Sequence, residues 1–298
     1  MADTVTADDL FDAEFLESLQ RLRLVAQRVP RGGRFAEQRS KALGAGLEFQ
    51  DYRPYSTGDD LRAIDWNIYR RLGRVFLRLF EELEDLPVYL LPDISRSMWI
   101  EQPPRAHACL RSAMAFAAIA LAQHDRVGVF PFAEDLHSPM QSRSGWNSLP
   151  LFAQAMAKLE AGGTTDLSRS LRRLEGMQLR SGLVVVISDF FDPAGAEAMV
   201  SALKRLKHKL LLVQLVHKSD RDPQVQGDVR LRDCESGVDQ DITVTAQVLE
   251  RYRHAYDNHA RILTDFAQKR RIGLVQLDVD KNVVEQIATV FEGGRYHA

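Results

Sequence analysis

The chain has 298 residues, of which 45% are hydrophobic and 27% charged, and its formal net charge is −2. These values are ordinary for a globular protein and allow one large α/β domain with a smaller appendage, or two domains. The near-neutral charge argues against a global field that would draw the protein to nucleic acid or to a membrane.

Cysteine content and hydropathy indicate the cellular compartment in which the protein is expected. The two cysteines, Cys109 and Cys234, fit neither a disulfide framework nor a zinc cluster, which favours a reducing environment. The acidic N-terminus lacks an apolar signal core, and no stretch reaches the ~18 consecutive apolar residues of a membrane helix. We therefore expect a cytoplasmic protein with no transmembrane segment. Peripheral membrane contact through the basic residues near Arg21–Arg34 is left open.

The N-terminal third predicts one amphipathic helix and a small subdomain. Residues 1–12 are polar and expected to be mobile, and apolar residues at helical spacing predict a helix over 13–29 that stops near Pro30. Asp59 or Asp60 can cap a short helix that ends at Gly73, and alternating apolar residues then predict a strand over 75–79.

Six arginines lie between Arg53 and Arg78, interleaved with aromatic residues and aspartates. One interpretation is an RNA-binding surface of stacking and basic groups. The other is a small subdomain in which the arginines pair with local acids. We favour the second interpretation because the acids balance the bases, and we expect no nucleic-acid partner.

From residue 87 onward, short apolar runs alternate with helical segments, which predicts a parallel sheet covered on both faces. Pro131 suggests that the strand over 126–132 lies near a sheet edge. Residues 228–244 break the alternation and predict a β-hairpin. The remaining expected strands are 87–92, 183–188, 210–216 and 273–278, and the expected helices are 106–123, 147–159, 168–177, 194–206, 246–270 and 283–291.

Side-chain oxygens follow three of these elements. Asp93, Ser95 and Ser97 come directly after the first buried strand, the segment Thr164-Thr165-Asp166 precedes a helix, and Ser188 and Asp189, with Asp192, follow the strand VVVIS. Each segment alone could be only a helix cap or a turn. Because the carboxyl ends of parallel strands meet at one edge of a sheet, the three together predict a shared site. Carboxylate and hydroxyl oxygens suit Mg²⁺, with Mn²⁺ and Ca²⁺ left open.

The pattern DISRS, GGTTDL and VVVISDFFD resembles the metal-ion-dependent adhesion site of von Willebrand factor A domains. More narrowly, GLEFQDYRPYSTGDDLRAIDWN, the LRDCESG hairpin and the RYRHAYDNH segment resemble the bacterial family called domain of unknown function fifty-eight, which is associated with MoxR-type AAA+ ATPases. The resemblance runs from about Arg34 to Arg295. Pro92 and Arg96 depart from the commonest form of the site, but neither removes a coordinating oxygen.

The resemblance implies an α/β fold: a von Willebrand factor A-like, Rossmann-like, doubly wound and mostly parallel sheet, with a small N-terminal α+β subdomain and an inserted β-hairpin. The expected divisions are a tail and helix at 1–33, a family-specific subdomain at 34–84, and the main domain at 85–298, with the hairpin at 228–245. The expected metal ligands are Asp93, Ser95, Ser97, Thr165 and Asp189.

The function implied is non-enzymatic. The chain would be a metal-dependent protein-interaction module, an adaptor or co-chaperone of a MoxR-type AAA+ ATPase in the maturation of client proteins. An acidic side chain of a partner would complete the metal site. The sequence contains no phosphate-binding G-x-x-x-x-G-K-[ST] or G-x-G-x-x-G motif and no G-x-S-x-G motif. Two alternatives remain: a scaffold that binds through the Arg53–Arg78 block, with a vestigial metal site, and a metal-dependent phosphoester hydrolase that uses Asp93 and Asp189.

Overall fold

The computed structural model describes residues 10–28, 47–56, 64–82, 87–137 and 139–292. The chain divides into two compact units, one formed by Met1–Pro30 with Leu86–Ala298 and the other by Arg31–Asp85. The larger unit contains the helix predicted over 13–29, which the structure places at α2 (Ala13–Arg28). All the residues of the candidate site lie in this larger unit.

A six-stranded sheet with the order β10-β7-β6-β3-β4-β5 forms the centre of the larger unit. Its five parallel strands are β3 (Pro87–Pro92), β4 (Arg126–Val129), β6 (Leu183–Ser188), β7 (Lys209–Val216) and β10 (Gly273–Asp278), and β5 (Met140–Arg143) runs antiparallel to β4 at one edge. The expected α/β fold with a mostly parallel sheet is therefore confirmed.

The strand that contains Arg126 lies near an edge, as expected: β4 pairs with β3 on one side and with the edge strand β5 on the other. Pro131 is not the cause of this position. The strand ends at Val129, so Pro131 lies beyond the ladder, where its missing N–H removes no strand pairing. The Pro131 carbonyl accepts a hydrogen bond from the His137 N–H instead.

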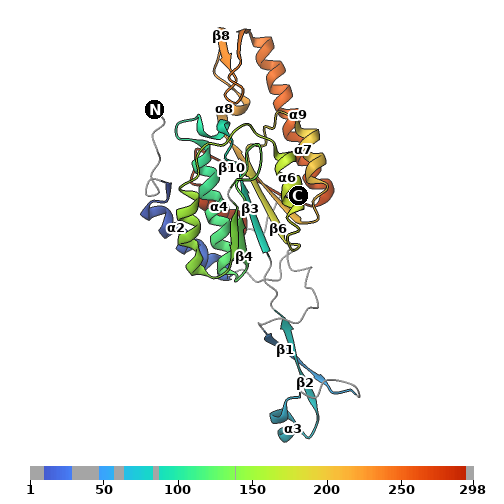
Figure 1. Ribbon diagram of the computed structural model, residues 1–298. Coiled ribbons are helices and arrows are strands. Elements are labelled where there is room, and N and C mark those ends of the chain that lie inside the picture. The colour runs from blue at the N-terminus through green and yellow to red at the C-terminus, as the bar shows by residue number, and fades with distance from the viewer. Residues whose placement is uncertain (1–9, 29–46, 57–63, 83–86, 138, 293–298) are drawn as a thin grey trace. The chain divides into compact units, whose positions relative to one another are not determined.

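Helices cover both faces of the sheet (Figure 1). Alternate strand residues separate into two cores: Val88 and Leu90 belong to one, and Tyr89 and Leu91 to the other. The first core is completed by α2, α4 (Arg105–Ala122), α5 (Leu149–Met156) and α10 (Val283–Glu292). The second is completed by α6 (Leu167–Gly176), α7 (Ala196–Leu203) and α9 (Ala246–Arg270). Burial on both faces explains why the strands are continuous apolar runs instead of alternating ones.

The last residues of the N-terminal segment, which we expected to be polar and mobile, pack into the hydrophobic core. Leu10 and Phe11 are 3% and 6% exposed and join the core on the α2 side. Arg111 of α4 contacts the same segment: its guanidinium donates to the Leu10 carbonyl at 2.8 Å and to the Asp12 carboxylate at 2.8 Å. The expected polar tail over residues 1–12 is therefore wrong at its last residues, whereas residues 1–9 lie outside the described part of the chain. None of the described helices has the length and apolar character needed to cross a membrane.

The predicted hairpin is present as β8 (Gly227–Arg232) and β9 (Asp239–Val244), which pair antiparallel. It follows the short helix α8 (Lys218–Arg221) and precedes α9 (Figure 1). Most of its strand residues are exposed, so the hairpin buries little of its own surface.

The smaller unit contains an antiparallel pair, β1 (Leu47–Pro54) and β2 (Phe76–Glu82), with α3 (Trp66–Leu72) between them in sequence. Asp65 caps α3, accepting hydrogen bonds from the N–H groups of Asn67 and Ile68 at 2.9 and 3.2 Å. The expected cap at Asp59 or Asp60 is wrong because α3 begins later, and both residues lie outside the described part of the chain. Gly73 ends α3 with φ +65°, as predicted.

Candidate functional site

Four of the five predicted ligands follow neighbouring strands, and the fifth, Thr165, precedes a helix. Asp93 directly follows β3, with Ser95 and Ser97 on the short helical turn after it. Thr165 lies in the loop before α6, and Asp189 directly follows β6. Because β3 and β6 are adjacent and parallel, the loops that carry Asp93 and Asp189 lie at one edge of the sheet. The Thr165 loop is joined to them by backbone hydrogen bonds, from the Gly162 N–H to the Ile94 carbonyl at 2.6 Å and from the Arg96 N–H to the Gly163 carbonyl at 3.0 Å.

Asp93 is the centre of this arrangement and is fully buried. Its Oδ1 accepts the backbone N–H of Ser95 at 2.9 Å, and its Oδ2 accepts the hydroxyl of Ser188 at 2.6 Å. The Oγ atoms of Ser95 and Ser97 lie 3.1 Å apart. Pro92 does not disturb the strand end, since its carbonyl accepts from the Phe132 N–H while the Asp93 N–H donates to Ile187. Asp93 and the two serines thus form one connected group.

Glycine and two acids position the Thr165 loop. A Cβ on Gly162 would lie 2.4 Å from the Ala133 Cβ, so the loop can pass here only without a side chain. Asp166 caps α6 by accepting from the Arg169 N–H at 2.7 Å. Asp192, from the loop after β6, accepts from the Leu167 N–H at 3.0 Å. These contacts hold Thr165 beside the ends of β3 and β6.

Asp189 has a cation close by, from a residue that we did not predict. Arg105, at the start of α4, is 5% exposed, and its guanidinium lies 3.6 Å from the Asp189 carboxylate. It also pairs with Glu101 at 2.6 Å and with Asp220 at 2.7 Å. Although burial disfavours its charge, the hydrogen bonds to Glu101 and Asp220 raise the pKa of Arg105. Arg105 therefore balances only part of the negative charge at this edge.

The two buried acids oppose each other electrostatically. Burial, which its hydrogen bonds only partly offset, raises the pKa of Asp93 to about 6. Burial and the charge of Asp93 together raise the pKa of Asp189 to about 7, against the opposing effect of Arg105. The raised pKa values of these two neighbouring carboxylates indicate that the positive charge near them does not compensate for their burial and mutual repulsion.

Three contributors escaped prediction as site residues: Ser188, Arg105 and Glu235. The sequence indicates Ser188 only as an oxygen at a strand end, whereas in the structure its hydroxyl donates to the Asp93 carboxylate. Glu235, from the turn of the hairpin, accepts hydrogen bonds from the hydroxyls of Ser97 and Thr165 at 3.1 and 2.8 Å. The one signal in the sequence was an acid at the tip of an expected hairpin, and nothing local indicates where that tip docks. Arg96, by contrast, is exposed, and its backbone N–H donates to the Gly163 carbonyl.

The donor set fits a hard divalent cation. Asp93 and Asp189 supply carboxylates, Ser95, Ser97 and Thr165 supply hydroxyls, and oxygen ligands of this kind suit Mg²⁺. Among the described residues, no three or more His, Cys, Asp or Glu side chains are arranged to hold a metal. The site would thus depend on hydroxyls and on ligands from outside the cluster.

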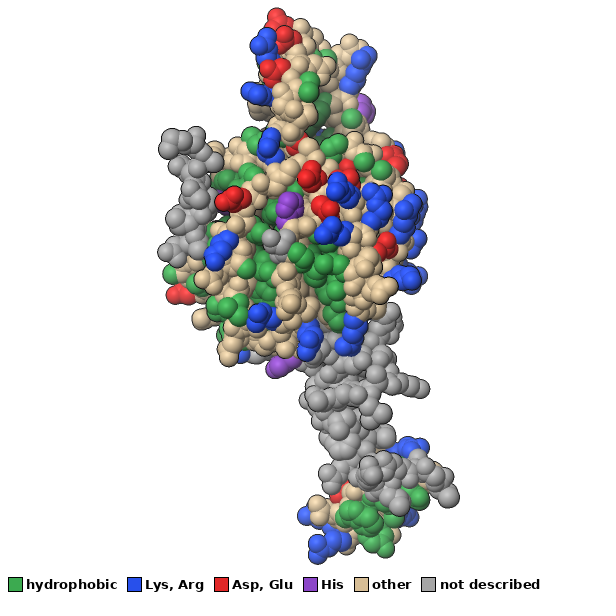
Figure 2. Space-filling model, in the orientation of Figure 1, with side chains coloured by type: hydrophobic (Ala, Val, Ile, Leu, Met, Phe, Trp, Pro, Cys, Tyr) green, Lys and Arg blue, Asp and Glu red, His purple; other side chains and the backbone are tan. Residues whose placement is uncertain are grey.

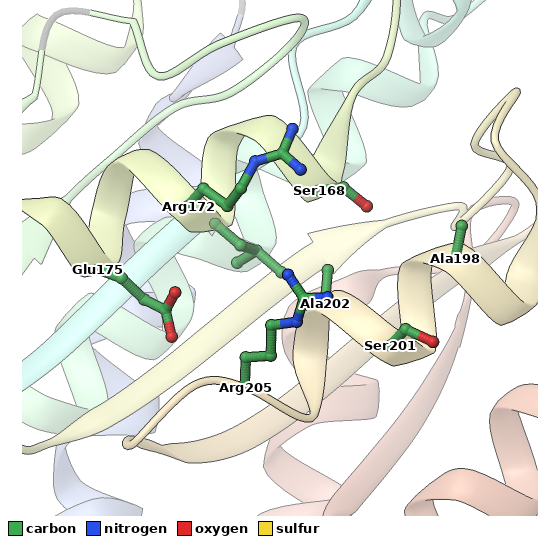
Figure 3. A pocket seen from close by; sticks show the side chains of 8 residues that line it. Ser168, Arg172, Glu175, Ala198, Ser201, Ala202 and Arg205 are labelled. Carbon is green, nitrogen blue, oxygen red and sulfur yellow. The ribbon is translucent and has the colours of Figure 1, made fainter.

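A separate groove of about 230 Å³ lies between α6 and α7 and includes no residue of the cluster. Figure 3 shows Arg172 and Glu175 on α6 and Arg205, just after α7, among the side chains that line it. In Figure 2, Lys and Arg side chains gather over this side of the molecule. The groove is therefore distinct from the candidate metal site in position and in charge.

Comparison with known proteins places these features in a family. The family model described as "Protein of unknown function DUF58" matches residues 51–262. Uncharacterized proteins from Mycobacterium tuberculosis (Rv1480) and Mycobacterium bovis (Mb1516) are each 24% identical over 260 residues, covering 84% of this chain and 80% of theirs.

Among solved structures, BatB from Bacteroides thetaiotaomicron is 16% identical, with a TM-score of 0.45, over 71% of this chain and 98% of that one. An aerotolerance-related membrane protein from Bacteroides fragilis is 17% identical, with a TM-score of 0.39, over 68% of this chain and 96% of its own.

Proposed function

The chain belongs to the DUF58 family of proteins of unknown function, and we propose that within it the protein is a non-enzymatic, Mg²⁺-dependent protein-interaction module with a von Willebrand factor A-like fold. The observation that carries the proposal is the convergence of two buried carboxylates and three hydroxyls at the carboxyl ends of β3 and β6. Neutral hydroxyls leave the charge of a bound cation only partly offset. Such a site attracts one further acid.

The roles of the residues follow from their contacts. Asp93 and Asp189 would hold the ion, directly or through water, and Ser95, Ser97 and Thr165 would supply hydroxyl oxygens. Ser188 orients Asp93 through its 2.6 Å hydrogen bond, and Arg105 pairs with Asp189 at 3.6 Å. The bound ion would supply the positive charge that recognises an acidic side chain of a partner protein.

We propose a MoxR-type AAA+ ATPase and its client as the partners, on the strength of the family resemblance noted in the sequence. The test is affinity capture from native lysate with ATP and either Mg²⁺ or chelator. Recovery of an AAA+ ATPase that depends on Mg²⁺ and is lost in Asp93→Ala supports the proposal. Equal capture in chelator contradicts metal dependence, and phosphoester turnover by the purified protein that is lost in Asp93→Ala contradicts a non-enzymatic role.

A second binding surface is favoured by α3 of the smaller unit. Trp66, Tyr69 and Leu72 are 59%, 43% and 66% exposed, and Arg70 and Arg71 lie on the same short helix. Exposed aromatic and basic residues of this kind are typical of protein contacts. Trp66→Ala compared with Asp93→Ala separates the two surfaces: if only Trp66→Ala abolishes capture, the scaffold alternative is correct. Arg62, the other residue of that alternative, lies outside the described part of the chain.

A further inference from the structure

The tip of the β8–β9 hairpin ends on the candidate metal site. Glu235 accepts three hydrogen bonds there: its Oε1 from the hydroxyls of Ser97 at 3.1 Å and Thr165 at 2.8 Å, and its Oε2 from the Thr165 backbone N–H at 3.1 Å. The donors come from the loop after β3 and the loop before α6, which are 138 and 70 residues away in sequence. One carboxylate therefore bridges two of the loops that build the site.

The turn itself is built to present this side chain. The Asp233 carboxylate accepts the Glu235 N–H at 3.0 Å and the Ser236 hydroxyl. Gly237 adopts φ +72°, which favours glycine, and its N–H donates to the Asp233 carbonyl at 2.8 Å. Glu235 is thus held at the end of an ordered turn instead of on a freely rotating loop.

The docking is not explained by hydrophobic packing. Leu231 and Val238, at the two ends of the turn, are 49% and 64% exposed, and the hairpin strands are mostly open to solvent. A two-stranded hairpin has little stability without a packed face. The described contacts of Glu235 are therefore a main attachment between the tip and the body of the domain.

Charge makes the position of Glu235 unusual. It places a further carboxylate near the buried acid Asp93, where repulsion opposes its approach. Two hydroxyls and one backbone N–H compensate part of that cost. A cation held by Asp93 and Asp189 would convert the repulsion into attraction, because the Glu235 oxygens face the same hydroxyls that would ligate it.

We propose that Glu235 is an internal acidic ligand of the site: it occupies the position that the acid of a partner would take, and the hairpin must move away before the partner can bind. The inference rests on the proposed function, because it assigns the regulation of the same site. It predicts that the site recognises a carboxylate, and that the isolated chain is self-blocked.

Cys234, adjacent to Glu235, reports the docked state. Cys109 is fully buried and Cys234 is partly exposed, so a thiol reagent added to the folded protein modifies Cys234. We expect Mg²⁺ to slow the labelling of Cys234 by about tenfold in the wild type, since charge-assisted contacts then hold the tip closed. Glu235→Gln should label faster and lose the response to Mg²⁺.

Two comparisons separate docking from a direct effect on the thiol. Glu235 and Asp233 raise the pKa of Cys234 in addition to the larger effect of burial, so Glu235→Gln alone changes its reactivity. Thr165→Val keeps the charge of Glu235 and removes the 2.8 Å contact, and it should also speed labelling in chelator. Asp241→Asn, which removes an exposed acid paired with Arg230 in the hairpin strands, should label like the wild type.

Direct measurement of Mg²⁺ binding by calorimetry distinguishes a failure of the internal ligand from a failure of the metal-dependent function. Suppose that Mg²⁺ binds the wild type but does not change the rate of Cys234 labelling in the wild type, in Glu235→Gln or in Thr165→Val. The proposal that Glu235 is an internal ligand is then overturned, and the metal-dependent module stands. If no Mg²⁺ binds but Thr165→Val still speeds labelling in chelator, the docking of the tip stands and the metal-dependent function falls.

Discussion

The hydroxyl of Ser188 donates a 2.6 Å hydrogen bond to the Asp93 carboxylate, joining the ends of the two central strands. The Ser188 Oγ also accepts the Phe190 N–H at 2.9 Å, so this hydroxyl links the Asp93 carboxylate to the backbone after β6. Phe190 has φ +64° and is buried, so the backbone after β6 adopts a costly conformation next to the site. Strain and buried charge at one position are typical of a site kept for binding.

Asp93→Asn should stabilise the metal-free protein. The amide keeps an acceptor for the Ser95 N–H and removes a buried charge, so we expect a gain of about 1–3 kcal/mol at pH 7 in chelator. The pKa of Asp93 is raised to about 6, so the cost of its charge is fully present above that pH and is lost as the pH falls toward its ordinary value. The advantage of the variant should therefore shrink between pH 7 and pH 4 in urea denaturation.

The same variant should also lose stabilisation by Mg²⁺, because ligands that bind only the folded state raise its stability by mass action. Asp265→Asn, an exposed acid on α9, serves as the control and should behave like the wild type in both measurements. A variant that is less stable than the wild type in chelator at pH 7 would show that Asp93 is a structural acid.

Arg105→Met should destabilise the domain by about 3–5 kcal/mol, because it leaves Asp189 and Asp220 buried without their cation. Arg105→Lys should recover little of this, since an ammonium cannot reproduce the forked contacts of a guanidinium to three acids. Chemical denaturation in chelator measures both effects. Addition of Mg²⁺ should recover part of the loss in Arg105→Met; no recovery would indicate that no cation binds near Asp189.

Gly162→Ala should damage the Thr165 loop. The new Cβ would meet the Ala133 Cβ at 2.4 Å and the Ile94 carbonyl at 3.1 Å, and forced displacement of this kind costs about 1–3 kcal/mol. Gly176→Ala is the matched control, because nothing lies within 4 Å of its new Cβ and it should stabilise by about 0.4–1 kcal/mol. Thermal denaturation measures stability, and the Cys234 labelling rate reports whether Thr165 still holds Glu235.

His208 should make the fold sensitive to mild acid at the opposite end of β6. Its Nδ1 accepts the Gly182 N–H at 3.3 Å, and its ring packs edge-to-face on Tyr89 at 5.4 Å between centroids. Burial lowers the pKa of His208, so its contribution is present above the ordinary histidine pKa of about 6.5 and is lost as the pH falls below it.

The variant His208→Gln isolates that contribution. An amide oxygen can accept the Gly182 N–H and does not titrate, so the variant should lose less thermal stability than the wild type between pH 7.5 and pH 5.5. Comparison of the two proteins cancels the titration of Asp93 and Asp189, which acts in the opposite direction. Equal losses in the two proteins would mean that His208 plays no part in the acid response.

Much of the architecture could be read from local patterns. The apolar runs from Pro87 onward predict parallel strands because a strand buried on both faces has no polar side, and the structure has these strands in the expected places. The grouping of Asp93, Thr165 and Asp189 could be anticipated for a related reason: parallel strands bring their carboxyl ends to one edge. Their role as metal ligands stays a prediction.

The exact residues at which strands and helices begin and end could not be predicted from local patterns. The expected strand over 126–132 included Pro131, but β4 ends at Val129, because sequence does not show where a strand stops within a few residues. The cap of α3 was misassigned because several aspartates precede that helix and only the backbone geometry selects Asp65.

The fold class, the order of strands and helices along the chain, and the polar residues at the strand ends could be predicted, because these follow from hydrophobic periodicity and turn chemistry within short windows. The contacts of Arg105 with Asp189, of Ser188 with Asp93, and of Glu235 with the hydroxyls of Ser97 and Thr165 arise only in the folded chain. The physical reason is distance along the chain: these contacts join residues 70 to 138 positions apart, and no local preference sets where a hairpin tip or a helix start meets a distant loop.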